Sequence, residues 1–347
     1  MERIVEIACI AVHHRFSTLA FEKCVCFAAM PQSLVSANLR YLDQVARSGS
    51  IQAAAKELHV AASAINRQIL QLEEQLGAPL FERMPRGMRL TVAGDAVVTL
   101  ARRWRQDERR LESEIRRYQG VHQGHVTLHA MDSHSTSVLP PLVAALGESH
   151  PLISLSVNLG STDEALAAVM AGTADLVAAF NLPPRREVLV LWRTELPFGC
   201  VVAPSHPLAG AHSVSLQEAA AYPVALQSRA LAIRRYLDAQ YGWLFTEARG
   251  RFESNSLQLV KQLALGGRHV VFTSELDAAP ELAAGLLRFV PVRDKGAEPQ
   301  TIGIAVDATR PPGPLVKVVA EHLQAAIERA LEASRAGASK IAPPASG

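Results

Sequence analysis

The sequence predicts an α/β protein built from three successive parts. Residues 31–91 carry apolar residues at helical spacing in three short blocks, and residues 92–119 continue as one long helix. After residue 124, strand-like apolar runs alternate with helical segments, which is typical of an α/β domain with a parallel sheet. We therefore expect a mainly helical first domain, a linker helix with its hinge in residues 92–123 and a larger α/β domain in residues 124–335.

The first domain is predicted to contain three short helices. The first covers residues 39–48 and ends at Gly49, because glycine adopts the left-handed C-cap conformation without steric cost. Ser50 suits the N-cap of the second helix, residues 51–58, and the third helix covers about residues 61–76. A small second helix, a tight turn and a third helix form the helix-turn-helix arrangement, whose last helix enters the major groove of DNA.

Polar side chains on the second and third helices suit contacts with DNA. On the third helix they lie opposite an apolar stripe that includes Ile65, Ile69 and Leu72, and such groups bind base edges or phosphates. The candidate DNA-binding residues of the two helices are Ser50, Gln52, Ser63, Asn66, Arg67 and Gln68. A small helical domain whose polar groups are merely solvated is the alternative, since the helix pattern alone is not specific.

A basic hairpin is predicted directly after the third helix. Pro85 and Gly87 form its tip, because proline and glycine favour tight turns. Arg83, Arg86 and Arg89 surround this tip and complete the set of candidate DNA-binding residues. Such a wing lies along phosphates or in a minor groove. The residues thus predict a winged helix-turn-helix over residues 31–91.

Three contiguous stretches carry a family resemblance. They are LRYLDQVARSGSIQAAAKELHV, INRQILQLEEQLGAPLFER and RGMRLTVAGDAVV. Together they closely resemble the DNA-binding domain of LysR-type transcriptional regulators. The resemblance implies a winged helix-turn-helix, a dimerising linker helix and a two-lobed, periplasmic-binding-protein-like effector domain. The implied partners are double-stranded DNA with a promoter inverted repeat, a small-molecule effector, a second copy in a homodimer or homotetramer, and RNA polymerase.

The third helix departs from the family pattern at its start. The family usually opens this helix with Ser-Gln-Pro and later has Ser-Arg, where this sequence has Ala61-Ala62-Ser63 and Asn66-Arg67. Ala61 offers no side-chain oxygen as a cap, which costs roughly 1 kcal/mol. Ala62 cannot hydrogen-bond to a base edge, although it can touch a thymine methyl group. The fold prediction is unaffected, and Ser63 and Asn66 become the candidates for base discrimination.

The composition is that of a globular protein with a local basic region. The chain has 347 residues, is 49% hydrophobic and 20% charged, and has a net charge of +2. Its arginines are crowded between residues 83 and 117, which suits one nucleic-acid face. The cysteines are Cys9, Cys24, Cys26 and Cys200. They form no disulfide framework, Cys24 and Cys26 are a redox or metal pair or a chance pair, and a reducing cytoplasm is expected. No apolar run is long enough to span a membrane.

Both ends of the chain differ from the rest. Residues 1–30 have no counterpart in the family, and we interpret them as a non-native or disordered extension, with Met30 as a candidate start. Residues 336–347 are small and polar, which is typical of a disordered tail.

The linker helix carries a heptad pattern. Its apolar positions are Val97, Trp104, Leu111 and Tyr118, with Ala101 and Ile115 on a second seam. Arginines fill the positions between them, so we expect a coiled-coil stripe with a charged exterior. The alternative is a helix packed on its own domain.

The α/β domain also resembles its LysR counterpart, in VLPPLVAAL, HPLISLSV, ALAAVMAGTADLVAAF and VVAPSHPLA. In that fold the chain crosses to a second lobe and returns. We place lobe 1 at about residues 124–198 and 288–335, with residues 288–292 as the returning strand and residues 315–332 as the closing helix. Lobe 2 then covers about residues 199–287.

Ligands of two-lobed α/β proteins bind in the cleft, at strand C-termini and helix N-termini. Loops with hydroxyl and amide groups occur at such places in this sequence. The candidate effector-binding residues are Ser133, Ser135, Thr136, Ser161, Thr162, Gln227, Ser228 and Thr273. Helix N-termini favour anions, so we expect a small anionic or polar metabolite. Each segment alone is equally a polar helix cap.

Other functions are weaker interpretations of the sequence. No cofactor is predicted, and no metal, because His122, His125, His129 and His134 spread over a hinge, a strand and a loop. An enzyme is not expected, since Gly-x-Ser-x-Gly, phosphate-loop and His-Glu-x-x-His motifs are absent from the sequence. A transport binding protein shares the two-lobed fold, but the winged domain argues against it. A DNA-binding paralogue without effector response stays open.

Overall fold

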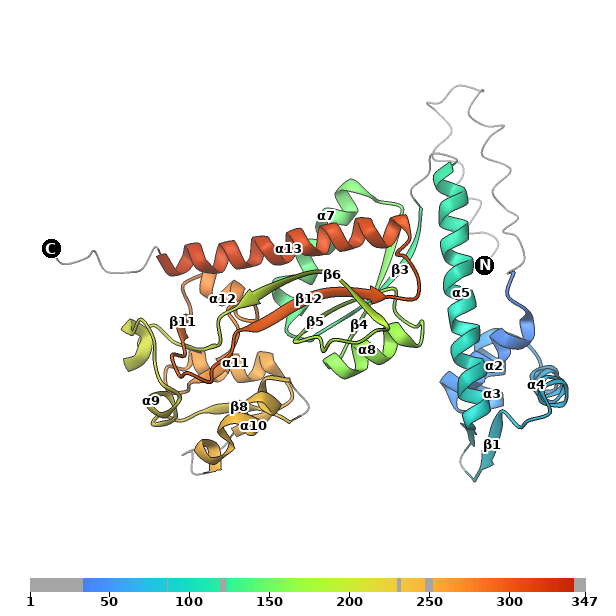
Figure 1. Ribbon diagram of the computed structural model, residues 1–347, viewed down its shortest axis with the longest axis horizontal. Coiled ribbons are helices and arrows are strands. Elements are labelled where there is room, and N and C mark those ends of the chain that lie inside the picture. The colour runs from blue at the N-terminus through green and yellow to red at the C-terminus, as the bar shows by residue number, and fades with distance from the viewer. Residues whose placement is uncertain (1–33, 86, 119–122, 230–231, 247–251, 340–347) are drawn as a thin grey trace, which may run out of the picture.

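The computed structural model describes residues 34–85, 87–118, 123–229, 232–246 and 252–339 (Figure 1). A small helical domain, residues 34–91, is called the head here. One long helix leads from the head to a two-lobed α/β domain (Figure 1). Within the described residues, no helix is both long and apolar enough to cross a lipid bilayer. The predictions for residues 1–30, Arg86 and residues 340–347 lie outside the described residues.

The head contains three helices and a hairpin. They are α2 (Ala37–Ser48), α3 (Ile51–Leu58), α4 (Ala62–Leu76), β1 (Phe81–Met84) and β2 (Gly87–Leu90). Gly49 ends α2 with a left-handed φ of 65°, and Ser50 caps α3 by accepting a hydrogen bond from the Ala53 N–H. His59 has a φ of 54° in the turn before α4. The predicted winged helix-turn-helix is therefore confirmed.

The first part of the long helix α5 (Val92–Tyr118) belongs to the head core. Val98 is fully buried together with Leu42, Ile65 and Leu80. Ala101 is fully buried against Val35 and Leu39, so the prediction that it lies on a coiled-coil seam is wrong, and the half-buried Val97 packs against the head core. The exposed apolar stripe of α5 is Leu100, Trp104, Leu111 and Ile115, each 44–49% exposed. Trp104, Leu111 and Ile115 are predicted seam positions, while the side chain of Tyr118 lies outside the described residues.

Lobe 1 is built on a five-stranded sheet with the strand order β4-β3-β5-β12-β6. The strands are β3 (Gly124–Ala130), β4 (Ile153–Leu159), β5 (Leu176–Phe180), β6 (Val188–Leu196) and β12 (Gln300–Asp307). β3 pairs in parallel with β4 and β5, as predicted, whereas β12 is antiparallel to β5 and β6. The predicted parallel sheet is therefore confirmed for β3, β4 and β5 but not for β12, which returns from lobe 2 and inserts between β5 and β6.

Helices cover both faces of the lobe 1 sheet (Figure 1). They are α6 (His134–Ser137), α7 (Leu139–Ser149), α8 (Thr162–Met170) and α13 (Pro314–Ser339). The single helix expected over residues 137–148 is broken at Val138, where prolines occupy the start of α7. Residues 336–339, expected to be disordered, belong to α13. Gly337 lies so close to α12 (Ala279–Ala283) that an added Cβ would be 2.4 Å from the Leu282 carbonyl oxygen.

Lobe 2 contains a three-stranded sheet, ordered β10-β7-β11, and a parallel pair, β8 with β9. The strands are β7 (Gly199–Val202), β8 (Ala225–Gln227), β9 (Phe252–Ser254), β10 (Val271–Thr273) and β11 (Arg288–Pro291). Around them lie η2 (Pro207–Gly210), α9 (Leu216–Ala220), α10 (Ala232–Thr246) and α11 (Leu257–Leu265). The strand at residue 288 was expected in lobe 1, which is wrong. It pairs with β7, placing Phe289 opposite Val201.

Candidate DNA-binding surface and interlobe cleft

The polar face of α4 is open at the head surface. Ile65 and Ile69 are buried on one side of the helix, while Ser63 and Arg67 are exposed and Asn66 is half-buried. Gln68 is also half-buried. The helix begins at Ala61, which makes no side-chain cap hydrogen bond. The structure therefore offers hydrogen-bonding side chains on a helix whose position is fixed by apolar packing.

The start of α3 adds two candidates with different roles. Gln52 is exposed. The Ser50 hydroxyl caps its own helix, because it accepts a hydrogen bond from the Ala53 N–H at 3.5 Å. A hydroxyl group has a second lone pair and a proton, so this cap leaves Ser50 able to make one further contact.

The wing is tied to the turn between α2 and α3. The Met88 N–H donates to the Gly49 carbonyl oxygen at 2.8 Å, and a Cβ at Gly87 would be 2.4 Å from that oxygen. Arg83 is exposed without an ion pair to any described residue. Arg89 pairs with Glu82 at 2.6 Å on the exposed face. Arg83 is thus the more available of the two described wing arginines.

A buried carboxylate that the sequence analysis missed joins the head to the linker helix. Asp43 is 1% exposed and receives three guanidinium groups. Its oxygens lie 3.1 Å from Arg47 Nε, 2.6 Å from Arg102 Nε and 3.2 Å from Arg105 Nη1. Arg102 and Arg105 were expected on a solvated exterior, and no local pattern marks Asp43 as their partner.

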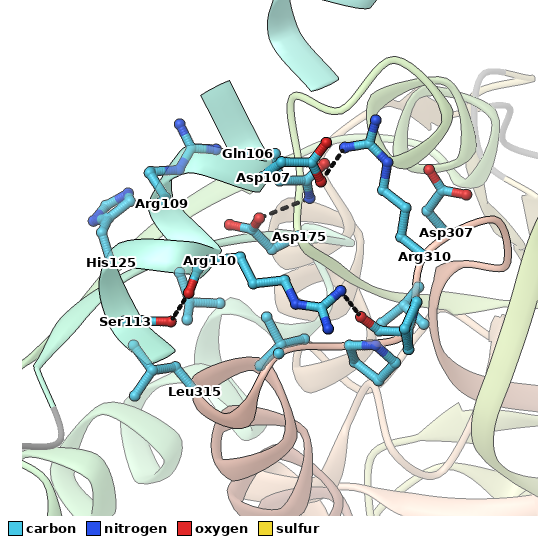
Figure 2. A pocket seen from close by; sticks show the side chains of 16 residues that line it. Gln106, Asp107, Arg109, Arg110, Ser113, His125, Asp175, Asp307, Arg310 and Leu315 are labelled. Atoms are coloured by element: carbon cyan, nitrogen blue, oxygen red, sulfur yellow. Dashed lines mark hydrogen bonds and ion pairs between the residues drawn. The ribbon is translucent and has the colours of Figure 1, made fainter. Parts of the chain in front are cut away.

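Lobe 1 holds the linker helix through a second set of contacts (Figure 2). Gln106 Nε2 donates to Asp175 Oδ1 at 2.7 Å, and Arg310 Nη1 donates to Asp107 Oδ1 at 3.0 Å. Gly172, with a φ of 68°, lets the chain approach α5 so closely that a Cβ would be 3.2 Å from the Gln106 side chain. The linker helix therefore contacts both the head and lobe 1.

The cleft between the lobes collects residues from segments of both lobes that are far apart in the sequence. Its lining is Met131, Asp132, Ser133, Phe180, Gln227, Ile233, Leu257, Thr273, Asp277 and Gln300. Three predicted effector residues, Ser133, Gln227 and Thr273, lie in this lining. Asp277 and Gln300 were missed. One local sequence pattern could have pointed to Asp277. Ser274 and Asp277 have the spacing of a capping box, and they exchange hydrogen bonds in the structure.

The other predicted effector residues lie outside this lining. Ser161 caps α8 and shares a capping box with Glu164, and the buried Thr162 hydroxyl donates to the Phe180 carbonyl oxygen at 3.0 Å. Ser135 and Thr136 lie on the short helix α6, and Thr136 is exposed. Ser228 has a buried hydroxyl group without a hydrogen-bond partner in the described part of the chain. For Ser161 the alternative interpretation as a polar helix cap describes its contacts, whereas the Thr162 hydroxyl joins α8 to β5.

The cleft lining has polar atoms without protein partners among the described residues. Gln227 Nε2 donates to the Phe272 carbonyl oxygen at 2.7 Å, which leaves Oε1 without a partner. Thr273 Oγ1 donates to Asp277 Oδ2 at 2.9 Å, which leaves Asp277 Oδ1. Ser133 Oγ and Gln300 Nε2 are likewise without partners. Buried polar atoms are normally hydrogen-bonded, so these atoms suit a polar ligand.

His134 lies behind the cleft and is fully buried against Phe180. Burial lowers its pKa to about 4, and the nearby Asp277 carboxylate opposes this shift. Neither ring nitrogen has a hydrogen-bond partner among the described residues. The ring is therefore neutral near pH 7. No group of three His, Cys, Asp or Glu residues that could hold a metal occurs in the described ranges.

Family comparisons match both halves of the chain. Residues 36–95 match the bacterial regulatory helix-turn-helix protein model of the lysR family, and residues 119–328 match the LysR substrate binding domain. The chain belongs to the LysR family. It is a LysR-type DNA-binding transcriptional regulator with an effector-binding domain, within a family of transcriptional regulators.

Several proteins are similar to this LysR-type regulator. The RuBisCO operon transcriptional regulator of Allochromatium vinosum is 28% identical over 228 residues, covering 65% of this chain and 73% of that protein. The HTH-type transcriptional activator CmpR of Synechocystis is 25% identical, covering 72% and 81%. A full-length OxyR variant from Pseudomonas aeruginosa has a TM-score of 0.62 at 20% identity, covering 83% and 96%. CbnR in complex with its target DNA has a TM-score of 0.54 at 22% identity, covering 83% and 98%.

Proposed function

We propose that this LysR-type regulator binds an interrupted inverted repeat through paired heads. The observation that carries the proposal is the exposed polar face of α4, opposite buried Ile65 and Ile69. Ser63 and Asn66 discriminate bases, while Arg67 and the wing arginines hold phosphates. Gln52, Gln68 and Ser50 support the same surface. The protein acts by binding rather than by catalysis.

The experiment is selection of bound duplexes from a random library, with full-length protein at a stated salt concentration. Enrichment of an inverted repeat supports a symmetric regulator that discriminates bases. The half-site sequence then shows which base is preferred next to Ala62. Salt-sensitive binding without enrichment would contradict the assigned role of Ser63 and Asn66, because phosphate contacts alone carry no sequence information.

Self-association follows from the apolar stripe of α5. Leu100, Trp104, Leu111 and Ile115 are exposed, although such side chains favour burial. A second α5 would cover them and place two heads on neighbouring half-sites. We expect a dimer or tetramer by analytical ultracentrifugation. A Leu111→Asp variant should dissociate, and a monomeric wild-type protein would contradict the proposal.

The proposed effector is a small polar metabolite in the interlobe cleft. The two charged residues of its described lining are Asp132 and Asp277, both acidic. Together with the amide groups of Gln227 and Gln300, they favour hydroxyl- or amine-bearing ligands over an anion. A ligand touching both lobes stabilises one lobe arrangement and thereby changes the relation of the paired heads, which alters promoter binding and contact with RNA polymerase.

Calorimetry against a metabolite panel tests the cleft. Gln300→Leu should weaken any ligand found by about 1 kcal/mol or more, since one hydrogen bond is lost to a buried group. The matched control is the double variant Ser135→Val, Thr136→Val, outside the lining, which should bind normally. Absence of binding across a broad panel would favour the effector-independent paralogue.

A further inference from the structure

A second groove lies between the head, the linker helix and lobe 1, away from the interlobe cleft. It has a volume of about 490 Å³, within the usual range for small-molecule sites. Its basic wall consists of Arg47 from α2 and of Arg102, Arg105 and Arg109 from α5. We call this space the arginine groove. Three parts of the molecule that are separate domains in the chain thus meet around it.

The arginine groove carries more positive charge than its own carboxylate balances. Asp43 is the acidic residue of the described lining, and it already binds Arg47, Arg102 and Arg105. Four guanidinium groups facing one carboxylate leave an excess of three positive charges. Burial lowers the pKa of Arg105, and Arg47 and Arg109 lower it further, while the carboxylates of Asp43 and Glu108 oppose the shift.

Donors remain available after these ion pairs form. Arg47 and Arg102 each use Nε toward Asp43, and a guanidinium group has five N–H donors. Arg109 makes no ion pair with a described residue, and its buried Nε has no hydrogen-bond partner there. Arg109 lies beside His125 at the rim of the junction between α5 and lobe 1 (Figure 2).

The opposite wall of the groove is polar and adds no acidic residue to the described lining. Lobe 1 contributes His125 and Thr127 from β3, Ser156 and Asn158 from β4, and Thr173. The Asn158 side chain is exposed and makes no hydrogen bond with described residues, while its backbone belongs to the ladder between β3 and β4. Hydroxyl and amide groups hydrogen-bond to oxyanions without adding charge, so they complement the guanidinium groups across the groove.

We propose that the arginine groove is a second ligand site, which takes a small anion bearing carboxylate or phosphate groups. Guanidinium groups bind both oxyanions in bidentate fashion. A bound anion bridges the arginines of the head and linker helix to the polar wall of lobe 1. It therefore strengthens the attachment of lobe 1 to the head, and this attachment is coupled to operator affinity.

Calorimetry on the full-length protein tests the site, with inorganic phosphate, pyrophosphate and succinate as probes at low salt. We expect saturable binding of at least one probe, and the comparison of the probes shows whether phosphate or carboxylate is preferred. Arg109→Gln and Asn158→Asp should each weaken binding at least tenfold. Arg185→Gln, the same charge change at an exposed position outside the groove lining, should bind as the wild type does.

The cleft variant Gln300→Leu separates the two sites, because it should leave anion binding unchanged. In wild-type protein the bound anion should shift operator affinity several-fold, and this shift should be absent in Asn158→Asp. No saturable binding of any probe would overturn the proposal, as would binding that both groove variants retain. Loss of DNA affinity and salt dependence in Arg109→Gln, without anion binding by the wild type, would assign the groove to DNA phosphates and also overturn it.

Discussion

The head and the interlobe cleft place their polar side chains in opposite ways. In the head, Ser63 and Arg67 are exposed on a helix whose other side buries Ile65 and Ile69. In the cleft, Gln227 and Thr273 are almost completely buried, and polar atoms without partners among the described residues lie beside Phe180 and Leu257. A rigid apolar scaffold presenting exposed donors suits a large, charged, hydrated partner such as DNA. Buried polar atoms suit a small ligand that replaces water.

The largest expected effect breaks the head while sparing the cleft. Ile65→Ala removes a side chain with 0% exposure from the centre of the head core. Such truncations cost about 2–5 kcal/mol, so the head should unfold at lower denaturant concentration and DNA binding should be lost. Denaturant unfolding followed by circular dichroism measures the loss. Leu70→Ala, on the exposed side of the same helix, is the matched control and should change stability much less.

The second effect belongs to the cleft and depends on pH. The pKa of His134 is lowered to about 4 by burial, so the unfolded chain takes up the proton at higher pH than the folded protein does. The free energy of unfolding should therefore fall as the pH drops from about 6.5 to about 4, by roughly 3 kcal/mol from this group. Leu at this position cannot titrate, and no hydrogen bond is lost because both ring nitrogens lack described partners.

Comparison of wild type with His134→Leu isolates this contribution from other acid-sensitive groups. Thermal unfolding should give similar Tm values at pH 8, and a higher Tm for the variant near pH 5. An equal difference in Tm between wild type and variant at both pH values would show that His134 does not cause the pH dependence. The head variant Ile65→Ala should keep the wild-type pH dependence of the lobe transition.

The difference between the two regions also explains what the sequence could predict. The boundary between α2 and α3 follows from neighbouring residues, since Gly49 stops one helix and Ser50 starts the next. That Asp277 and Gln300 line the same cleft depends on how two distant segments fold together. No local pattern records such a meeting, just as none records the placement of β11 beside β7.

Long-range contacts account for the remaining errors as well. Ala101 fits a coiled-coil seam, but it is fully buried against Val35 and Leu39 of the head, so tertiary burial overrides the sequence period. Gly337 belongs to a small, polar segment by composition, yet α12 packs against it and extends the helix. Composition and period describe a segment alone, whereas its neighbours decide which of its faces is buried.

The third effect sharpens the role of the head surface. Arg67 is exposed and has no ion pair with a described residue, so Arg67→Ala should leave stability unchanged. Loss of a phosphate or base contact should cost about 1–3 kcal/mol in DNA affinity and reduce the salt slope by about 1. Fluorescence anisotropy with the selected duplex at several salt concentrations measures both. Arg185→Ala is the control, and equal losses for both variants would point to overall charge instead.

The smallest effect adds a missing cap. Ala61 precedes α4 with β-region dihedral angles, φ −68° and ψ 134°, and has no side-chain hydrogen bond to the helix. Serine fits the same angles, and its hydroxyl group can accept an N–H of the first turn, so Ala61→Ser should stabilise the head by about 0.5–1 kcal/mol. The reverse change at the preceding helix α3, Ser50→Ala, removes an existing cap and should destabilise the head by a similar amount. Chemical denaturation of both variants checks the pair. If Ala61→Ser raises stability and leaves the selected DNA sequence unchanged, position 61 acts only on the scaffold. A changed base preference would instead place position 61 in contact with DNA. The DNA-binding surface would then include the N-cap residue of α4 as well as its exposed face.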